Sequence, residues 1–211
     1  MAIKGLSDSF YAPYKPTEAD PDKYDYSGGG KFARMIDLDF SVTTNETELY
    51  SDNELEEADY SFSNGALKLG VSDLSDGVAA DLFGVEQQNV EEEEGVSENL
   101  YNESMVSNDV GFGVVIEKVK DSDTKYRAIV LTRVKFKVPG EVATTRGKQI
   151  TFQTGTIEGV AMRDRSEKRN YKRDATFSTR SAAIAYIKRI LKLSDTAAAT
   201  VTEGETDDGN S

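Results

Sequence analysis

Hydrophobic and polar residues alternate clearly along residues 34–44. Ile36, Leu38, Phe40 and Val42 occupy every second position, and Asp, Ser or Thr fill the positions between them. A period of two places alternate side chains on opposite faces of a strand. The pattern therefore predicts a strand with one buried face.

Two short apolar runs follow, at residues 60–62 and 67–71, on either side of the pair Asn64-Gly65. Asn-Gly between alternating segments is the strongest short-range signal for a tight hairpin turn. The sequence thus predicts a hairpin that reverses at Asn64-Gly65.

The second half of the chain carries further strand-like runs, which are rich in β-branched residues and bounded by polar turns. These runs are 110–119, 126–138, 150–163 and 171–177. In the second of them the apolar positions change parity between Leu131 and Val134, which predicts a β-bulge.

Two segments have the three-to-four-residue spacing of amphipathic helices. The shorter carries Val78, Leu82 and Phe83, after a cap at Ser72 or Ser75 and before Gly84. The longer, 179–193, is capped by Ser178 or Thr179, and its stripe consists of Ala183, Ile184, Ile187, Ile190 and Leu191. The predicted fold class is mainly β: a β-sandwich or barrel-like domain with one flanking C-terminal helix and one short additional helix.

Composition along the chain predicts three parts. Residues 1–30, with three prolines and a Gly triplet, are expected to form an extended arm with a short strand at 10–14. Residues 31–193 form one β domain, in which 45–59 is a long acidic connection of the kind that is usually functional or disordered. Residues 194–211 are acidic and nearly free of large apolar side chains, so a disordered tail is predicted.

Composition also narrows the chemistry. The chain has no Cys and no His, which excludes thiolate nucleophiles, disulfides and imidazole bases. The run Gly28-Gly29-Gly30-Lys31 lacks the spacing of a phosphate loop, and the acidic clusters lack a calcium-loop pattern. No catalytic constellation is visible, so we expect no enzyme activity, no cofactor and no metal. The start lacks the pattern of a signal peptide, which predicts a protein made in the cytoplasm.

The net charge of −13 is distributed unevenly. Residues 1–109 contain 6 Lys and Arg against 25 Asp and Glu, whereas residues 110–193 contain 19 against 8. Opposite fields on two halves favour head-to-tail contacts between copies. The alternative is that both halves fold together and their charges partly cancel within one domain.

The segment 163–173 is the sharpest basic patch, with Tyr171 inside it. Basic residues interleaved with an aromatic ring are typical of nucleic-acid binding, so a small nucleic-acid-binding module is one hypothesis. Because Asp164, Glu167 and Asp174 alternate with the basic residues and the rest of the chain is acidic, a protein interface is the better interpretation. A solvated hairpin turn is the plain alternative.

Taken in order, the motifs resemble a specific family. They are YSGGGK, a strand ending in TT, an acidic loop opening with LYSDN, LKLGV after NG, then GFGVVIEK, YRAIVLTRVKFKVP, TFQT, MRD, and ATF before AIAYIK. Over residues 1–193 this order resembles the major tail tube proteins of long-tailed, non-contractile bacteriophages of Gram-positive hosts.

The resemblance implies a structural virion protein, located in the tail, whose subunits form rings, commonly hexameric, that stack into a tube. Its partners would be other copies of itself and the tape measure, tail terminator and distal tail proteins, while DNA would pass through the lumen without specific binding. The loop 45–59 and the N-terminal arm would contact the next ring. The candidate assembly residues are then Glu48, Tyr50, Asp52, Glu54, Glu56, Glu57, Arg163, Arg165, Lys168, Arg169, Lys172 and Arg173.

Overall fold

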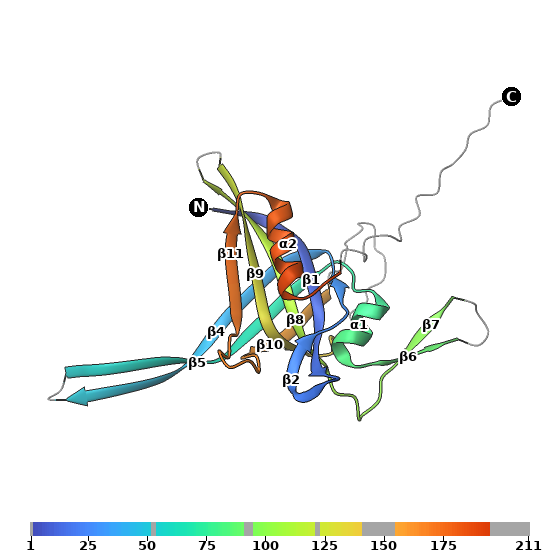
Figure 1. Cartoon of the computed structure of the whole chain (residues 1–211), viewed down its shortest axis with the longest axis horizontal. Coiled ribbons are helices and arrows are strands. Elements are labelled where there is room, and N and C mark those ends of the chain that lie inside the picture. Colours follow the sequence, from blue (N-terminus) through green and yellow to red (C-terminus); the bar gives the residue numbers. More distant parts are fainter. Residues whose placement is uncertain (1, 52–53, 91–94, 121–122, 141–154, 195–211) are drawn as a thin grey trace, which may run out of the picture.

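The computed structural model describes residues 2–51, 54–90, 95–120, 123–140 and 155–194. Its strands are β1 (Ala2–Thr17), β2 (Asp20–Tyr26), β3 (Gly30–Lys31), β4 (Met35–Ser51), β5 (Glu54–Val71), β6 (Glu86–Asn89), β7 (Ser97–Leu100), β8 (Asp109–Lys120), β9 (Asp123–Phe136), β10 (Gly155–Met162) and β11 (Lys172–Phe177). The helices are α1 (Asp76–Phe83) and α2 (Arg180–Ile190). Figure 1 shows both helices against a body of strands from which the β4–β5 and β6–β7 hairpins project on opposite sides.

Nine strands form one antiparallel sheet. The pairing order is β2-β1-β8-β9-β10-β5-β4, with β3 paired to β1 and β11 paired to β9. On the edge of β9 that faces away from β8, residues 126–131 pair with β11 and residues 133–136 pair with β10. The sheet therefore divides into two branches along β9. The bulge expected between Leu131 and Val134 lies at this division, because β8 advances by two residues there while β9 advances by three. The extra residue turns both Leu131 and Val134 into the same core.

The sheet curls around its larger hydrophobic core. Tyr11 of β1, Phe112 of β8, Ile157 of β10 and Leu69 of β5 all belong to this core, and Phe40 of β4 packs against it. The two ends of the strand order therefore face one another across shared side chains. Among the described residues β4 does not pair with β1, β2 or β3, so the curled sheet is an open barrel.

Helix α1 closes this core, and its ends follow from its sequence. Ser75 is the N-cap position, and Gly84 adopts the left-handed conformation that ends the helix, with φ +67°. Leu82 and Phe83 are buried in the core.

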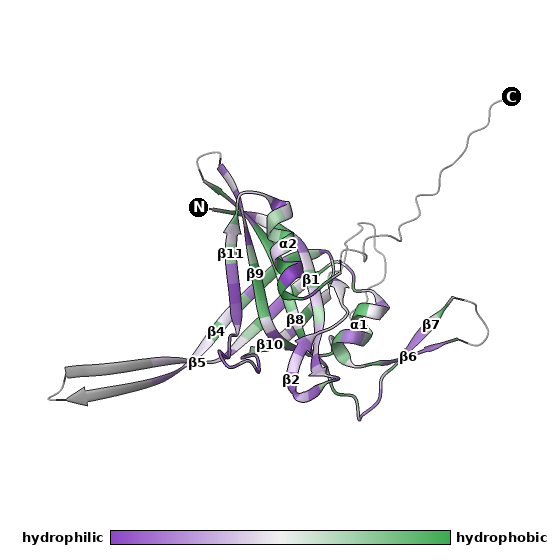
Figure 2. Cartoon of the chain, in the orientation of Figure 1, coloured by the Kyte–Doolittle hydropathy of each residue, from purple (hydrophilic) through white to green (hydrophobic). Residues whose placement is uncertain are grey.

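Helix α2 covers the opposite face of the sheet, over a second, smaller core. Its N-cap is Thr179, whose side chain accepts a hydrogen bond from the Ala182 amide. Ala183, Ile187 and Leu191 are buried against strand residues such as Phe10 and Val115. The hydropathy colouring of Figure 2 shows hydrophobic residues along β8 and β9, and hydrophobic and hydrophilic residues interspersed along α2.

Two glycines of β8 allow α2 to approach the sheet. A Cβ at Gly113 would lie 2.4 Å from Ile187 Cγ2, and one at Gly111 would lie 2.6 Å from Leu191 Cδ2. Because side chains alternate along β8, Phe112 and Val114 face the larger core from the other side. The run Gly111-Phe112-Gly113-Val114 therefore leaves space for α2 on one face of β8 and fills the larger core on the other.

The predicted fold class is confirmed: the protein is mainly β, with a C-terminal helix and one short helix. The strands expected at 110–119, 126–138 and 171–177 are present as β8, β9 and β11. The strand expected at 150–163 is present as β10, although residues 150–154 lie outside the described residues.

The prediction of an N-terminal arm at 1–30 was wrong. Strand β1 lies inside the sheet, paired with β8 on one side and with β2 and β3 on the other. Phe10 faces the α2 core, while Tyr11 faces the larger core. Prolines and glycines suggested an arm, but apolar residues at consecutive positions can be buried only by a strand that is covered on both faces.

The prediction that residues 45–59 form a long irregular connection was also wrong. Strands β4 and β5 continue through it, pairing from Met35 opposite Val71 to Ser51 opposite Glu54. This stretch is mostly polar, and its few apolar residues do not alternate, so it gives no hydrophobic period from which a strand could be predicted.

The hairpin turn predicted at Asn64-Gly65 was wrong as well. Both residues lie within β5, with Asn64 opposite Thr43. A Cβ at Gly65 would lie 2.5 Å from Phe40 Cε2, so this glycine makes room for a neighbouring ring and not for a turn. The acidic tail predicted at 194–211 lies, apart from Ser194, outside the described residues.

Candidate assembly surface

The β4–β5 hairpin leaves the body of the protein and extends away from it (Figure 1). Its register places Glu48 opposite Ala58, Tyr50 opposite Leu55 and Glu54 opposite Ser51. The register shifts between Leu49 and Tyr50, and this leaves Glu56 between two paired positions.

The predicted acidic candidates therefore share the outer part of this hairpin. Glu57 pairs with Leu49, one position before the shift. Asp52 lies outside the described residues. The expected loop is in fact a two-stranded ribbon, which fixes the order of its acidic residues along two antiparallel strands.

The base of the hairpin is attached to the basic segment. Phe62 of β5 stacks on Tyr171, with ring centroids 3.8 Å apart and planes 8° from parallel. The Arg163 guanidinium lies 5.6 Å from the centre of the Phe62 ring and donates a hydrogen bond to the Phe62 carbonyl. These contacts fix the direction in which the ribbon leaves the sheet.

The basic segment itself is an ordered turn between β10 and β11. Buried Asp164 accepts hydrogen bonds from the amide and hydroxyl of Ser166, and its own amide donates to the Asn170 carbonyl. Arg169 has a positive φ of 48°. The turn is therefore held from within by a local hydrogen-bond network.

Aromatic residues of β1 and β2 hold the start of this turn. The Arg165 guanidinium lies 4.0 Å from the centre of the Tyr24 ring and donates to the Tyr24 hydroxyl at 2.6 Å. The Arg165 amide donates to the Tyr14 hydroxyl at 3.0 Å. Arg165 thus has a structural role within the chain, and its expected role in assembly stays a prediction.

The remaining basic candidates differ in exposure. Lys168 and Arg169 are exposed at the tip of the turn. Lys172 and Arg173 begin β11, opposite Leu131 and Val130, where Lys172 is half-buried and Arg173 exposed. The structure therefore places the basic segment at the base of the hairpin, whereas Glu48 to Glu57 lie towards its tip.

Part of the charge asymmetry cancels within the chain. The Arg180 guanidinium binds Asp8 with two hydrogen bonds of 2.7 and 3.0 Å, and Arg133 binds Asp109 at 2.7 Å. Partial burial acts to raise the pKa of Asp8, but the hydrogen bonds from Arg180 and the backbone outweigh it, so that pKa is lowered. Lys192 also pairs with Asp25.

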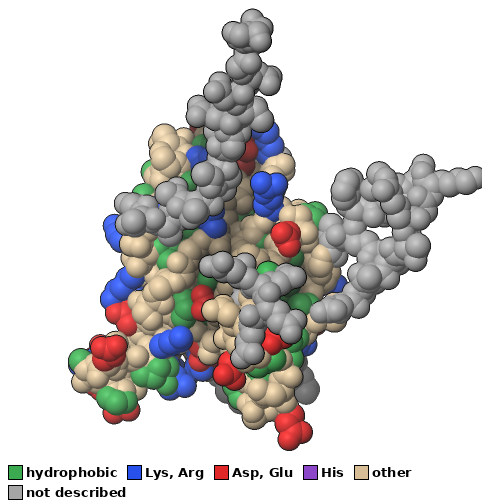
Figure 3. Space-filling model, turned by 90° about the vertical axis from the view of Figure 1, so that its right-hand side faces the viewer, with side chains coloured by type: hydrophobic (Ala, Val, Ile, Leu, Met, Phe, Trp, Pro, Cys, Tyr) green, Lys and Arg blue, Asp and Glu red, His purple; other side chains and the backbone are tan. Residues whose placement is uncertain are grey.

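These pairs support the interpretation that the charges of the two halves partly cancel within one domain. Head-to-tail contact between copies stays a prediction. On the face drawn in Figure 3, acidic and basic side chains are interspersed and hydrophobic ones are scattered.

Sequence reasoning missed the clamp formed by Phe62, Tyr171 and Arg163. The sequence indicates Tyr171 only as an aromatic ring inside a basic patch. One face of that ring is already covered by Phe62. The two residues are far apart in the sequence and carry no shared motif, so only the three-dimensional structure brings them together.

No group of acidic side chains that could hold a metal ion occurs among the described residues. No helix in the same part of the chain is long and apolar enough to cross a membrane. No protein-family model matches the sequence, and no curated protein matches it either.

Proposed function

We propose that this protein is the major tail tube subunit of a long-tailed bacteriophage, a structural protein of the virion that assembles into stacked rings. The rings, hexameric by the resemblance of the sequence, form the tube through which DNA enters the host. The tape measure, tail terminator and distal tail proteins are the expected partners. The observation that carries the proposal is the β4–β5 ribbon.

A ribbon of two strands is at best marginally stable in water when nothing packs against it. The described part of β4 and β5 beyond Thr44 and Phe62 continues away from the body. A neighbouring subunit would supply the missing contacts, and the acidic sequence of the ribbon would direct it to a basic surface.

The edges of the sheet support the same proposal. Within the described residues β4, β2 and β11 each pair on one side only. Unpaired edges are templates for pairing with another chain, and a closed ring of subunits leaves few of them exposed.

The net charge of −13 on each chain suits a tube that carries DNA without binding it. An acidic wall repels phosphate over roughly 8 to 10 Å at physiological salt. Strong binding of duplex DNA by the free subunit would be inconsistent with this role.

Negative-stain electron microscopy tests the proposal, with solution mass measured on the same samples at rising concentration. We expect rings or hollow tubes with a hole wide enough for duplex DNA. A variant in which residues 47–58 are replaced by a two-residue Asn-Gly turn should keep the thermal unfolding of the body and lose the tubes. A matched control replaces residues 87–99, the outer β6–β7 hairpin, by the same turn.

A single chain at every concentration that retains duplex DNA in low salt would overturn the proposal. It would favour a nucleic-acid-binding module that uses 163–173. Tubes that still form without residues 47–58 would remove the ribbon from the assembly mechanism.

A further inference from the structure

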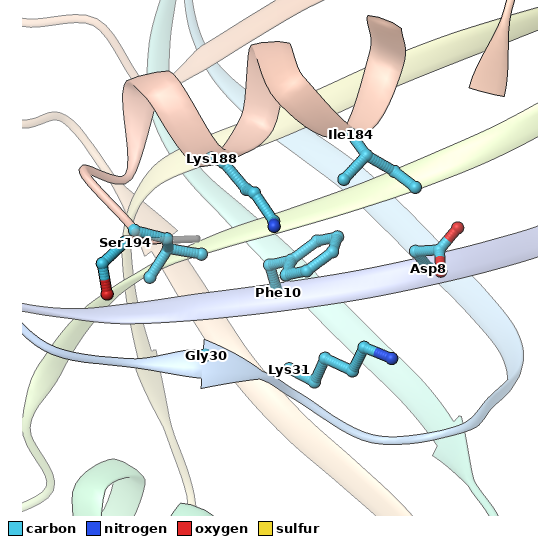
Figure 4. Close-up of a pocket in the computed structure, with 8 residues that line it drawn as sticks. Asp8, Phe10, Gly30, Lys31, Ile184, Lys188 and Ser194 are labelled. Carbon is cyan, nitrogen blue, oxygen red and sulfur yellow. The ribbon is translucent and has the colours of Figure 1, made fainter. Parts of the chain in front are cut away.

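A groove runs along α2 on the outside of the body. Two adjoining hollows of about 200 Å³ and about 500 Å³ share Asp8 and Lys31. In the close-up of Figure 4, α2 forms one wall with Ile184 and Lys188, β1 forms the floor with Phe10, and the strand carrying Gly30 and Lys31 forms the other wall.

The two ends of the groove differ in chemistry. The end at Ser194 is lined by Phe10, Ile184 and Leu193, with Lys188 above Phe10. The other end is lined by the serines of β1 and by Lys31, Arg34 and Arg180. The groove thus passes from an apolar end to a basic end.

The chain leaves the described structure at the apolar end. Ser194 lines the groove, and residues 195–211 follow it. After Asp195 and Thr196 comes Ala197-Ala198-Ala199-Thr200-Val201, and the last part contains Glu203, Glu205, Asp207 and Asp208; the segment has no Lys or Arg. From Ala197 onward the order is apolar and then acidic, which matches the apolar and basic ends of the groove.

The lengths also agree. From Ser194 back to Arg180 is about 20 Å, at 1.5 Å per residue for the helical part. An extended chain covers about 3.3 Å per residue, so roughly six residues after Ser194 reach the basic end. After Asp195, the next acidic residue is Glu203, three residues beyond that point, where the cluster of four carboxylates begins.

We propose that the groove is a binding site for an extended acidic peptide and that its occupant is the chain's own segment 195–211. The small apolar residues cover Phe10, Ile184 and Leu193, and the carboxylates lie against Lys31, Arg34 and Arg180. Arg180 already shares its charge with Asp8, so Lys31 and Arg34 provide most of the attraction. The inference does not depend on the proposed tube function.

Distance measurement between two spin labels tests this in the full chain. The protein has no native Cys, so the labels attach only at the two introduced residues. These are Ser181→Cys at the exposed start of α2 and Thr206→Cys in the acidic segment. Dilution into unlabelled protein removes distances between molecules, whatever the state of assembly. We expect a narrow, short distance in low salt and a broad distribution in 1 M salt, where the Debye length falls to about 3 Å.

The charge-reversed pair Lys31→Glu/Arg34→Glu should reduce the short-distance population severalfold. The control pair Lys168→Glu/Arg169→Glu, at the tip of the basic turn, should leave it unchanged. A broad distribution in the parent, or a short distance that survives both salt and Lys31→Glu/Arg34→Glu, overturns the proposal. So does a short distance between singly labelled molecules in a mixture, because the occupant would then be the segment of a second copy.

Discussion

The rings of Phe62 and Tyr171 stack 3.8 Å apart, and they join the base of the projecting ribbon to the turn that precedes β11. The Tyr171 carbonyl also accepts a hydrogen bond from the Thr132 amide at the bulge of β9. The ribbon is therefore anchored at the place where the sheet divides.

Replacing Tyr171 by Ala should loosen the base of the ribbon. Loss of the stacked pair removes about 0.5 to 1.5 kcal/mol beyond the buried area, so the free energy of unfolding should fall by at least that amount. Amide hydrogen exchange should accelerate in residues 42–46 and 60–64 and stay unchanged in β8. Tyr171→Phe keeps the stack and is the control; equal exchange in the Ala and Phe variants would contradict the role of the ring.

The contact between α2 and β8 depends on Gly113. A methyl group there would lie 2.4 Å from Ile187 Cγ2, so Gly113→Ala should destabilise the protein by about 1 to 3 kcal/mol through overpacking. Gly5 lies in β1 with nothing within 4 Å of the added Cβ, and Gly5→Ala should cost nothing. Denaturant unfolding measures both variants.

The same contact can be tested by compensation. Ile187→Ala alone should cost about 2 to 5 kcal/mol, because it leaves a cavity under α2. In the double variant with Gly113→Ala the two losses should be less than additive, since the new methyl group enters the space that Ile187 leaves. Strict additivity would show that the helix moves away instead.

The sequence predicted those elements whose side chains have a clear period. α1 and α2 have both an apolar stripe and capping residues, and β8 and β9 are apolar runs rich in β-branched residues and bounded by polar turns. The parity change between Leu131 and Val134 even located the bulge. Such features are determined within a dozen neighbouring residues, so a local pattern is sufficient.

Elements determined by distant residues escaped prediction. β1 lies inside the sheet because β8 pairs with it and α2 covers one of its faces, and its prolines gave no sign of this. Gly65 is required by Phe40 and gives no turn, and Arg165 packs on Tyr24 within the chain. In each of these cases the partner is far away in the sequence, and no local signal distinguishes it.

Two buried tyrosines predict a loss of stability at alkaline pH. Burial raises the pKa of Tyr11, and its hydrogen bond of 2.7 Å to Asp81 raises it further; burial also raises the pKa of Tyr26, which donates to the Thr132 carbonyl. Because both pKa values are raised on folding, this stability is fully present below the unfolded pKa of about 10 and is lost as pH rises through the folded values.

Each of these tyrosines should lower the free energy of unfolding by about 1.4 kcal/mol per pH unit above pH 10. Denaturant unfolding at pH 9 and pH 11 measures the loss. Tyr11→Phe and Tyr26→Phe should each reduce it, whereas Tyr60→Phe, at an exposed ring, should not. An unchanged pH dependence in Tyr26→Phe would show that this hydroxyl ionises freely in the folded state.

Substitutions in the basic turn should distinguish an effect on folding from an effect on assembly. Arg165 packs on Tyr24, so Arg165→Glu should cost about 1 kcal/mol of stability in the single chain. Lys168 and Arg169 are exposed at the tip, so Lys168→Glu/Arg169→Glu should leave unfolding unchanged. If the acidic ribbon of one subunit approaches this turn of the next, the double variant should form tubes more slowly in low salt.

Light scattering over time measures the rate of assembly at several salt concentrations. The difference between the parent and Lys168→Glu/Arg169→Glu should be largest in low salt and shrink as salt rises, because screening removes the attraction that guides the encounter. The final amount of tube should change less than the rate, since exposed ion pairs contribute only about 0 to 1 kcal/mol each. An equal rate for the two proteins in low salt would mean that the ribbon is recognised by another surface. The charges of the basic groove beside α2 would then be the next to reverse by substitution.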